Sequence, residues 1–332
     1  MAAKDLELLC VGNALVDVFA RADEAKCARY GLEKPVQHIE IEKLLALLSE
    51  LETESSRGNL SPLVVTSGGG AANVAKIAGF LGAKLCFTGA IGADRYGLLF
   101  ESDLRAACAE PRLLRKNAPT GICVYLETTN ETRVAASPSA ALELAESDIA
   151  DEDIKRAGVV VIDGFMLHRK DFVRRILLEA DKYETAAALD LSSPSIAGEY
   201  AAEIADLARK FRLILFMNEA EAEAFCKGVR NEEFLRSLTA GKAFPIVIVK
   251  RGERGAVVFS GGKTHYAETL AVTPVESTGA GDAFAAAFLT AWVRKKPLPE
   301  CAALGNKAAA LVLKVRGTKA SGMMFRELAE HM

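Results

Sequence analysis

The residues with the clearest capacity for chemistry form the run Gly279-Ala280-Gly281-Asp282, which precedes a segment whose apolar residues recur with helical spacing. A helix entered through such small residues presents unpaired backbone N–H groups, backed by the positive end of the helix dipole, and so can bind an anion. Asp282 falls in the first helical turn, beside that anion. A carboxylate there is commonly only a favourable cap. Asp282 alone therefore does not decide between a base and a cap.

A second glycine-rich run, Ser67-Gly68-Gly69-Gly70, separates an apolar segment from another helical pattern, and Asn73 follows it. Three glycines allow a ligand to approach the backbone without meeting a side chain, although glycine is also the usual residue of a plain turn. The Asn73 amide offers a donor and an acceptor, as a pair of sugar hydroxyls would require. The run indicates a loop that binds a polar ligand, with an ordinary turn as the alternative.

Asn218 and Glu221 stand three residues apart at the start of a further helical pattern. This spacing puts both on one face of the helix start, where they could organise Mg²⁺ and its waters. A pair of this kind taken alone would more often be a cap and a solvated charge.

Composition narrows the class of protein that carries these runs. The chain has 332 residues, of which 50% are hydrophobic and 26% are charged, so it can bury a large core. These values exclude a disordered, collagen-like or disulfide-stapled protein. The formal net charge of −3 provides no global basic field for nucleic acid.

The cysteines and the hydropathy pattern point to a cellular compartment. Seven cysteines form no CxxC pair, and the four histidines complete no zinc-ligand spacing, so reduced thiols are expected. The first residues mix acidic and apolar types without an apolar signal region, and no apolar run reaches the ~18 residues that span a bilayer. We expect a cytoplasmic protein with neither a nucleic-acid nor a membrane partner.

Two common nucleotide-binding motifs can be set aside. Gly261-Gly262-Lys263-Thr264 ends like a P-loop, but Val257 stands where that motif needs a glycine. No GxGxxG pattern follows the first apolar run, so a dinucleotide-binding oxidoreductase is a distant alternative.

Short apolar runs, typical of strands buried on both faces, alternate with helical patterns along the chain. The apolar runs are 8–11, 63–65, 85–87, 159–162, 186–189, 213–216 and 246–249. The helical patterns are 41–51, 71–80, 96–107, 172–182, 203–211, 219–226, 282–294 and 299–313. This alternation predicts an α/β fold in which a mainly parallel sheet is covered by helices on both faces.

Two segments interrupt this rhythm. Residues 13–38 have mixed polarity, and residues 120–138 contain two β-runs joined by a polar turn. We expect both segments to leave the main sheet and form a small β-rich lid over the strand ends, where α/β folds bind ligands. The expected core is then made of residues 1–12, 39–119 and 139–332.

In their order along the chain, these motifs resemble the ribokinase (PfkB) family of carbohydrate and nucleoside kinases. The resemblance covers nearly the whole chain and implies a ribokinase-like three-layer α/β/α core. Residues 67–75 resemble the first family signature, residues 278–284 the second, and Asn218-Glu219-Ala220-Glu221 an NxxE element. Residues 250–255, and residues 305–310 followed by Gly317, resemble the nucleotide side.

The resemblance implies a role for each motif residue. Asp282 would take the proton from a primary hydroxyl, while the amides of Gly279, Ala280 and Gly281 would offset charge on the transferring γ-phosphate. ATP and Mg²⁺ would be the cofactors. The residues implied on their side are Asn218, Lys250, Gly252, Gly255 and Asn306 for ATP, and Glu221 for Mg²⁺ through water.

Within the family, residues 11–17, 120–123 and 130–133 look most like the adenosine-kinase branch. There, the residue at the position of Asp17 holds ribose hydroxyls, and Arg133 would face the phosphates. The substrate-binding residues implied are Asn13, Asp17, Gly69, Gly70, Asn73 and Arg133.

We therefore expect an ATP-dependent phosphotransferase acting on the primary hydroxyl of a ribofuranosyl substrate, with a nucleoside favoured. A kinase of a free sugar such as fructose or ribose, and a non-catalytic sugar- or nucleoside-binding protein, are the alternatives. Phe19, Tyr125 and Phe165 are the aromatic residues placed to sandwich a purine. Dependence on K⁺ stays open, because Glu276 stands where many relatives have Asp at a monovalent-cation site. The spare strand edges of the lid allow either a monomer or a homodimer.

Overall fold

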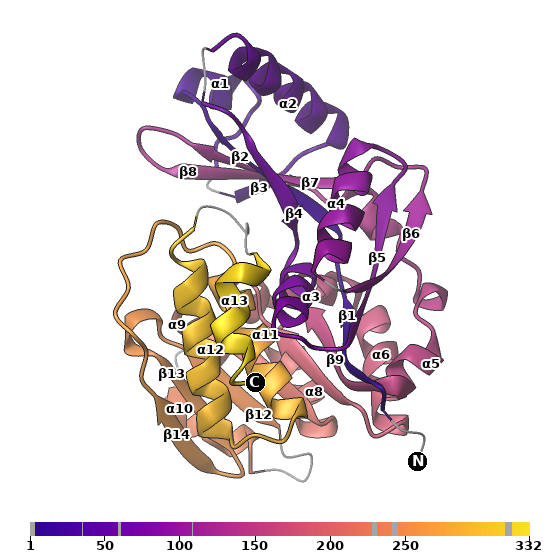
Figure 1. Cartoon of the computed structure of the whole chain (residues 1–332), viewed down its shortest axis with the longest axis vertical. Helices are drawn as coiled ribbons and strands as arrows, with labels where there is room; N and C mark the ends of the chain where they lie inside the picture. Colours follow the sequence, from indigo (N-terminus) through magenta and orange to yellow (C-terminus); the bar gives the residue numbers. More distant parts are fainter. Residues whose placement is uncertain are drawn as a thin grey trace.

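The protein was analysed as a computed structural model. The residues that it describes are 4–34, 36–58, 61–107, 109–227, 231–240, 245–315 and 321–332. They form a large three-layer body and a smaller β-layer beside one end of it (Figure 1).

The large body is built on a sheet whose described part has nine strands, in the order β14-β13-β12-β11-β10-β9-β1-β5-β6. These strands are β1 (Leu6–Val11), β5 (Leu85–Gly92), β6 (Glu110–Lys116), β9 (Ala157–Asp163), β10 (Ala186–Asp190), β11 (Leu213–Asn218), β12 (Ile246–Lys250), β13 (Ala256–Ser260) and β14 (Lys263–Ala267). From β12 to β6 the neighbours run parallel, and β13 and β14 add an antiparallel edge.

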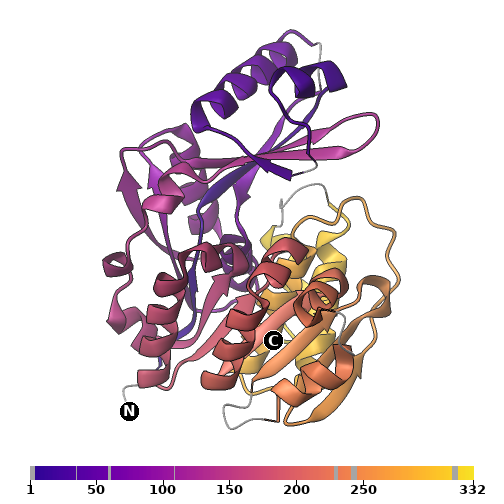
Figure 2. The ribbon, with the colours of Figure 1, turned by 180° about the vertical axis from the view of Figure 1, so that it is seen from behind.

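Helices cover both faces of this sheet. One face carries α3 (Gly70–Phe80), α4 (Arg95–Ala106), α11 (Ala280–Val293), α12 (Leu298–Val312) and α13 (Gly322–Ala329). The other face, seen in Figure 2, carries α5 (Asp151–Arg156), α6 (Lys170–Lys182), α7 (Pro194–Glu199), α8 (Ala201–Lys210), α9 (Glu219–Cys226) and α10 (Asn231–Leu238). Short 3₁₀ turns are η1 (Ser139–Glu143), η2 (Glu146–Asp148), η3 (Gly164–Arg169) and η4 (Gly252–Arg254).

The apolar strands explain this layering. In β1, Leu8 and Cys10 enter the core under α3 and α11, whereas Leu9 and Val11 enter the core under α6 and α8. Because successive side chains of a strand point to opposite faces, a strand that is apolar throughout must be covered on both sides. The expected α/β fold with helices on both faces is confirmed.

The smaller layer is a five-stranded sheet in the order β3-β8-β7-β2-β4. Its strands are β2 (Leu15–Arg21), β3 (Val36–His38), β4 (Val64–Gly68), β7 (Gly121–Glu127) and β8 (Thr132–Ser137). Helices α1 (Glu24–Arg29) and α2 (Ile41–Ser56) lie on its outer side, away from the large body (Figure 1).

Because successive side chains of β2 point to opposite faces, the two faces of this sheet carry different residues. Val16 and Val18 are buried in the core that includes Leu44 and Leu47 of α2. Asp17 and Phe19, which alternate with these valines along the strand, therefore point to the inner side, toward the large body. One strand thus presents a carboxylate and an aromatic ring to the same space.

The second sheet includes a strand that we expected elsewhere. The sequence pattern places the run 63–65 among the strands of the main sheet, but β4 pairs antiparallel with β2 instead. That assignment is wrong because a three-residue apolar run carries no information about its partner, and Val64 and Val65 are only half-buried. We propose that residues 13–38 and 120–138 act with β4 as one lid on the core.

In the part of the chain that the structure describes, no helix has both the length and the apolar character to cross a bilayer.

Candidate active site

Polar residues gather where the parallel strands end. Asp163 is the last residue of β9, Asp190 of β10, Asn218 of β11 and Lys250 of β12. Neighbours in register are Asp163 with Asp190, and Asn218 with Lys250. This carboxyl edge is the usual ligand-binding edge of an α/β sheet, and the N-termini of α3 and α11 face it.

The run Gly279-Ala280-Gly281-Asp282 opens α11 as expected. Gly279 is the N-cap residue with φ of +80°, and no side chain caps the helix. The Ala280 N–H donates to the carbonyl oxygen of Ser277 at 3.3 Å, so it is already engaged. Asp282 does not cap α11, because its Oδ2 accepts a hydrogen bond of 2.9 Å from Asn73 Nδ2 on α3. The two glycine-rich runs therefore meet through their polar side chains.

A partly buried cation lies against this helix start. Lys250 Nζ donates to Asp190 Oδ2 at 2.6 Å, and a Cβ atom on Gly281 would come within 2.9 Å of Nζ. The glycine thus makes room for the ammonium group. Burial alone would lower the pKa of Lys250, but the carboxylates of Asp190, Glu221 and Asp282 raise it. Lys250 stays charged beside the first turn of α11.

The Asp282 carboxyl is tuned toward neutral pH. Burial and the nearby Asp190 carboxylate raise the pKa of Asp282 to about 6, against the lowering effects of Asn73, Lys250 and Lys76. A general base works best when its pKa lies near the operating pH. The position and the ionisation of Asp282 both suit proton abstraction.

The second glycine-rich run packs around Asp17. A Cβ atom on Gly68 would overlap the Asp17 carboxylate, and one on Gly69 would overlap the carbonyl oxygen of Asn13. Gly69, the N-cap of α3, also has φ of +91°, which favours glycine. Gly70 stands between two carboxyl groups, because a Cβ atom there would lie 3.3 Å from Asp163 Cβ and 3.7 Å from Asp282 Oδ1. The glycines therefore allow the carboxylates to approach the backbone.

Asp163 is a site residue that the sequence analysis missed. Its side chain is 3% exposed, and although the backbone amides of Asn13, Ala71 and Phe165 lie near the carboxylate, neither oxygen completes a well-directed hydrogen bond within the described residues. Burial and Asp282 raise the pKa of Asp163 to about 7, although the amides of Asn13 and Ala71 oppose this. A buried acceptor without a donor is costly, so Asp163 is placed to accept from a ligand. The signal was its position directly after the apolar run 159–162.

Replacement of Asp163 by Asn should stabilise the protein at alkaline pH. The folded-state pKa is raised, so the ionised group costs stability increasingly between about pH 4 and pH 7 and in full above that. We expect Asp163→Asn to increase the free energy of unfolding at pH 8 by up to about 4 kcal/mol, and by little at pH 4.5. Urea unfolding at both pH values checks this; an equal change at both would contradict the assignment.

The expected nucleotide-side residues form a scaffold around the end of β14. Gly252 and Gly255 make a tight turn after β12, closed by the Arg251 N–H and the Gly255 carbonyl oxygen at 2.7 Å. Asn306 Nδ2 on α12 donates to the carbonyl oxygens of Ala267 at 3.1 Å and of Glu268 at 2.9 Å. Asn306 therefore fixes the loop after β14. Gly317, which we expected nearby, lies outside the described residues.

A cavity of about 460 Å³ lies between the inner face of the lid and the loop before α11. Its lining residues include Phe19, Tyr125, Val134, Val275, Glu276 and Thr278. The rings of Phe19 and Tyr125 stack with centroids 4.6 Å apart and planes 11° apart. Phe165, on η3, is 43% exposed and does not line this cavity.

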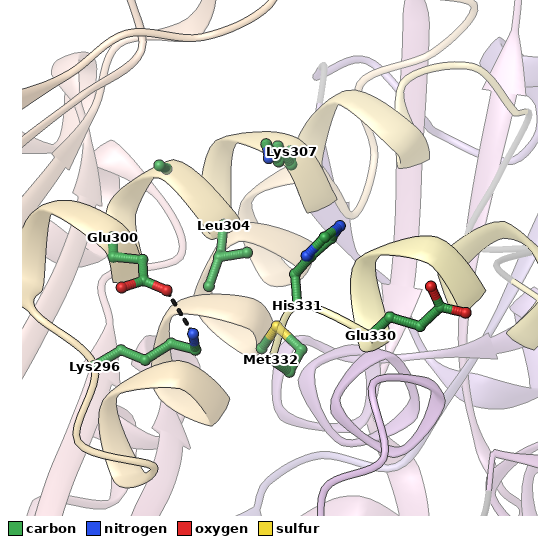
Figure 3. Close-up of a pocket in the computed structure, with 8 residues that line it drawn as sticks. Lys296, Glu300, Leu304, Lys307, Glu330, His331 and Met332 are labelled. Atoms are coloured by element: carbon green, nitrogen blue, oxygen red, sulfur yellow. Dashed lines mark hydrogen bonds and ion pairs between the residues drawn. The ribbon is translucent and has the colours of Figure 1, made fainter.

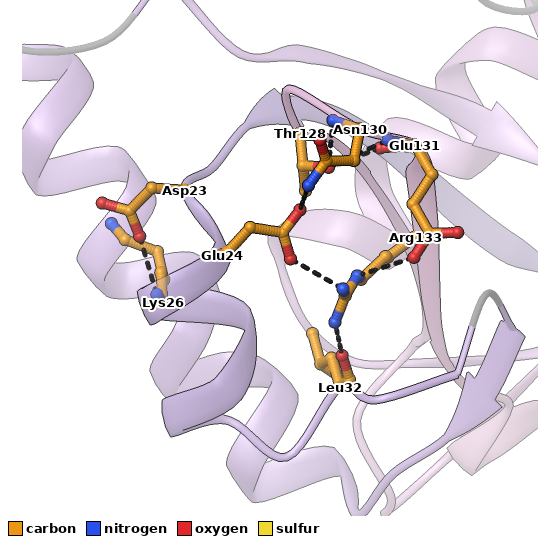
Figure 4. A network of polar contacts seen from close by, with 8 residues as sticks. All are labelled: Asp23, Glu24, Lys26, Leu32, Thr128, Asn130, Glu131 and Arg133. Atoms are coloured by element: carbon orange, nitrogen blue, oxygen red, sulfur yellow. Dashed lines mark hydrogen bonds and ion pairs between the residues drawn. The ribbon is translucent and has the colours of Figure 1, made fainter.

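Arg133 is not brought to this site. Its guanidinium contacts Glu24 at 2.6 Å, Glu131 at 3.2 Å and the carbonyl oxygen of Leu32 (Figure 4). Asn130 Nδ2 also donates to Glu24, at 3.3 Å. These contacts tie the β7–β8 hairpin to α1. For Arg133 to face phosphates, as the sequence suggested, it would have to leave these partners.

Comparison with known proteins now identifies the family. The profile of the pfkB family carbohydrate kinases matches residues 44–323. The chain belongs to the pfkB family of carbohydrate kinases. It is therefore an ATP-dependent phosphotransferase, and the family and fold predicted from the sequence are confirmed.

Two of the similar proteins are adenosine kinases, and a third is a probable sugar kinase. Adenosine kinase 2 of Arabidopsis thaliana is 25% identical over 333 residues, covering 93% of this chain and 94% of that protein. The adenosine kinase structure from Sinorhizobium meliloti has a TM-score of 0.85 and 27% identity, with 99% of this chain and 100% of that chain covered. A probable sugar kinase from Rhizobium etli CFN 42 also has a TM-score of 0.85, with 26% identity and the same coverage.

In this pfkB-family chain, the NxxE pair forms a reciprocal helix cap. The Asn218 N–H donates to Glu221 Oε2 at 2.7 Å, Asn218 Nδ2 donates to Oε1 at 2.8 Å, and the Glu221 N–H donates to Asn218 Oδ1 at 2.9 Å. Glu221 is buried, and burial together with Asp190 raises its pKa, while Lys250 lowers it. The cap that we weighed as the alternative is thus present.

Kinases of the pfkB family generally use ATP and Mg²⁺. The described residues hold no group of three or more His, Cys, Asp or Glu side chains arranged to bind a metal by themselves. Glu221 and Asp190 nevertheless place two hard oxygen donors of like charge near each other, and Mg²⁺ commonly takes few carboxylates and keeps several waters. We propose that Glu221 and Asp190 would hold such an ion through its waters.

A second cavity, of about 450 Å³, lies beside the C-terminal end of the described chain (Figure 3). It is lined by residues of α12 and the chain end, among them Lys296, Glu300, Lys307 and His331. It shares no residue with the site around Asp282.

Proposed function

We propose that this pfkB-family kinase transfers the γ-phosphoryl group of ATP to the primary hydroxyl of a ribofuranosyl acceptor, and that the acceptor is a nucleoside. The observation that carries the proposal is the inner face of β2, where Asp17 and Phe19 point to the same side. Residues two apart on a strand lie about 7 Å from each other. A ribose held by Asp17 would thus place its base near the stacked Phe19 and Tyr125 rings.

Hydrogen-bond acceptors of the protein would hold the sugar part of the substrate. Asp17 is 3% exposed, and Asp163 and the Asn73 Oδ1 atom lack well-directed hydrogen bonds within the described residues. Hydroxyl groups supply the missing donors. When the substrate binds, its hydroxyl groups donate hydrogen bonds to these buried acceptors, which otherwise lack them. The site therefore favours a ligand rich in hydroxyl groups over an apolar one.

The transfer then follows from the position of Asp282. The Asp282 carboxylate oxygen that is not bonded to Asn73 accepts the proton of the primary hydroxyl group. As the proton leaves, the hydroxyl oxygen forms a bond to the γ-phosphorus. The bond from phosphorus to the bridging oxygen of ADP breaks, and ADP leaves. The α11 N-terminus and the Lys250 ammonium group stabilise charge on the transferring phosphoryl group. Mg²⁺ held through Glu221 and Asp190 would neutralise phosphate charge when it is bound.

A free-sugar kinase is the second candidate, because the probable sugar kinase from Rhizobium etli matches this fold as well as an adenosine kinase does. The two candidates differ in the use of the cavity under the lid. A free sugar would occupy the space around Asp17 and Asp163 and leave the aromatic pair unused.

A panel of acceptors with ATP separates the two. We expect adenosine or another nucleoside to give a kcat/KM about 10- to 100-fold above that of ribose or fructose, since stacking of one base contributes about 1–3 kcal/mol. Tyr125→Leu should reduce the value for the nucleoside and leave that for ribose unchanged. A preference for ribose or fructose, unaffected by Tyr125→Leu, would contradict the nucleoside assignment.

A further inference from the structure

The chain passes from β6 of the large body to β7 of the lid through residues 117–120 (Figure 1). Thr120, the last residue of this crossing, is 0% exposed. Its backbone N–H donates to Asp94 Oδ2 at 2.7 Å, and its hydroxyl group donates to Asp94 Oδ1, also at 2.7 Å. The hydroxyl oxygen in turn accepts from the Gly92 N–H at 3.0 Å. Every polar atom with which Thr120 enters β7 is thus bonded to the turn between β5 and α4.

Asp94 belongs to the large body. It is the N-cap residue of α4, where its Oδ1 accepts from the Gly97 N–H at 2.8 Å. One carboxylate therefore accepts three hydrogen bonds, one from its own helix and two from Thr120. Burial would raise the pKa of Asp94, but these hydrogen bonds lower it, so the group stays ionised at neutral pH. Hydrogen bonds to an ionised acceptor are about twice as strong as those between neutral groups.

Glycines make room for this contact. A Cβ atom on Gly92, the last residue of β5, would come within 2.6 Å of the Thr120 nitrogen. One on Gly97 of α4 would come within 3.0 Å of Thr120 Oγ1. On Gly121, the first residue of β7, a Cβ atom would lie 2.4 Å from the carbonyl oxygen of Pro138, which follows β8. The start of β7 is therefore held closely against β5, α4 and the end of the hairpin.

Strand β7 carries this position to the acceptor side of the lid. It pairs parallel with β2, so that Asp17 lies opposite Cys123 and Phe19 lies opposite Tyr125. Because the two strands are hydrogen-bonded in register, a shift of the start of β7 would move both pairs together. The carboxylate and the rings proposed to hold the acceptor would then shift relative to α11, which carries the proposed base.

We propose that Asp94 and Thr120 are positioning residues that fix the start of β7 on the large body and so set the place of the acceptor relative to Asp282. Neither residue lines the cavity under the lid, and both act through β7 rather than on the substrates. The proposal rests on the proposed function for the acceptor site. The hold on β7 itself is measurable without turnover.

Thr120→Val tests the hydroxyl group alone. It keeps the shape of the side chain, the backbone hydrogen bond to Asp94 Oδ2 and the cap of α4, but it removes the hydroxyl acceptor of the Gly92 N–H. We expect kcat/KM for the acceptor to fall about 10- to 100-fold, since a misplacement of about 1 Å can cost about 100-fold. KM for ATP should not change, because the phosphates are expected at α11. Thr120→Ser keeps the hydroxyl group and should behave as the wild type.

Thr239 provides a matched control for loss of stability. It is also 0% exposed, and its Oγ1 donates to the carbonyl oxygen of Arg236 at 2.9 Å and accepts from the Gly262 N–H at 3.2 Å. Thr239→Val therefore removes a similar pair of hydrogen bonds, between the end of α10 and the turn that joins β13 to β14. Both valine variants should lower the melting temperature, but only Thr120→Val should change the kinetics with the acceptor.

Hydrogen exchange of the ligand-free protein, followed by mass spectrometry, measures the hold on β7 directly. Amides of residues 121–127 should exchange faster in Thr120→Val than in the wild type, and at the wild-type rate in Thr239→Val. Unchanged exchange of this segment in Thr120→Val would overturn the proposal. An equal loss of kcat/KM in Thr120→Ser would also overturn it, because the hydroxyl group would then not be the cause.

Asp94→Asn decides the matter if Thr120→Val does not fold. It retains an oxygen for the cap of α4 but offers the Thr120 N–H an amide nitrogen in place of Oδ2. It should accelerate exchange of residues 121–127 and lower kcat/KM for the acceptor without a change in KM for ATP. Wild-type exchange and kinetics in Asp94→Asn would overturn the proposal.

The two proposals can fail separately. If exchange of residues 121–127 rises as expected but the wild type phosphorylates no nucleoside or sugar, the proposed function fails and the hold on β7 stands. If the wild type phosphorylates a nucleoside and Thr120→Val does so with the same kcat/KM, Asp94 and Thr120 only stabilise the fold, and the inference is wrong.

Discussion

Asp282→Asn should lower kcat by about 10²–10⁴-fold, the range that a general base contributes, while the protein still binds ATP and the acceptor. Asn keeps the size of the side chain and can still take the hydrogen bond from Asn73 Nδ2. What it loses is the ability to accept the proton of the hydroxyl group. Wild-type kcat should rise with pH through about 6, where Asp282 ionises, and this limb should disappear in the variant. Initial rates of ADP release from pH 5 to 9 measure both effects.

The loss cannot be attributed to unfolding, because the pKa of the Asp282 carboxyl is raised in the folded protein. Replacing the ionised carboxylate by a neutral amide therefore removes an unfavourable contribution to the stability of the folded protein at neutral pH. The melting temperature should not fall. Asp206→Asn on the exposed side of α8, where Asp206 pairs with Lys210 at 2.8 Å, is the matched control and should retain full activity. A kcat within tenfold of the wild type in Asp282→Asn would remove Asp282 from the role of base.

Asp17→Ala should lower kcat/KM for the acceptor by about 10²–10⁴-fold, because two hydroxyl groups lose a charged acceptor at about 1.5–3 kcal/mol each. KM for ATP should stay within about twofold, since Asp17 lies on the lid side and the ATP phosphates are expected at α11. Steady-state kinetics with each substrate varied in turn separate these effects.

Gly68→Ala offers an independent check of the same geometry. A methyl group at this position would overlap the Asp17 carboxylate, so acceptor binding should weaken although Asp17 is still present. Asp181→Ala, at an exposed aspartate, is the control for loss of a carboxylate. If Asp17→Ala binds and phosphorylates the acceptor normally, Asp17 does not hold the sugar.

The features that could be predicted from the sequence are those encoded locally. Gly279 and Gly69 each open a helix with a positive φ, and glycine is the residue type that such a position favours. Strands β1, β9 and β11 are apolar on both faces, which directly predicts a covered sheet. The segments 121–127 and 132–137 form the β-hairpin that alternation and the polar turn indicate.

The features that escaped prediction depend on contacts between distant segments. Asp190 and Lys250 are 60 residues apart, and only the neighbouring strands β10, β11 and β12 bring their side chains to 2.6 Å. Asp163 became a site residue because Gly12 and Gly70 pack against it, which no local pattern reveals. Strand β4 joined the lid because β2 provides it with a partner.

Arg133 shows that a motif does not reveal all the contacts of a residue in the folded chain. Its place in the lid hairpin resembled that of a phosphate-facing arginine, but Glu24 and Glu131 lie closer to it than any group of the site does. These acids come from α1 and from the hairpin turn, and α1 lies in a segment whose residues show no clear helical pattern. Because α1 cannot be predicted from the sequence, the ion pair between α1 and Arg133 cannot be predicted either.

The most direct test of the central claim is the position of the transferred phosphate. Wild-type protein and Asp282→Asn would be incubated side by side with Mg²⁺, ATP and adenosine, and the products analysed by phosphorus-31 and proton NMR. The account predicts that the wild type forms one phosphomonoester, on the primary hydroxyl of the ribose, with an equal amount of ADP, and that the variant forms it at least about 100-fold more slowly. A phosphate on a secondary hydroxyl, or ADP released without a phosphorylated acceptor, would contradict it.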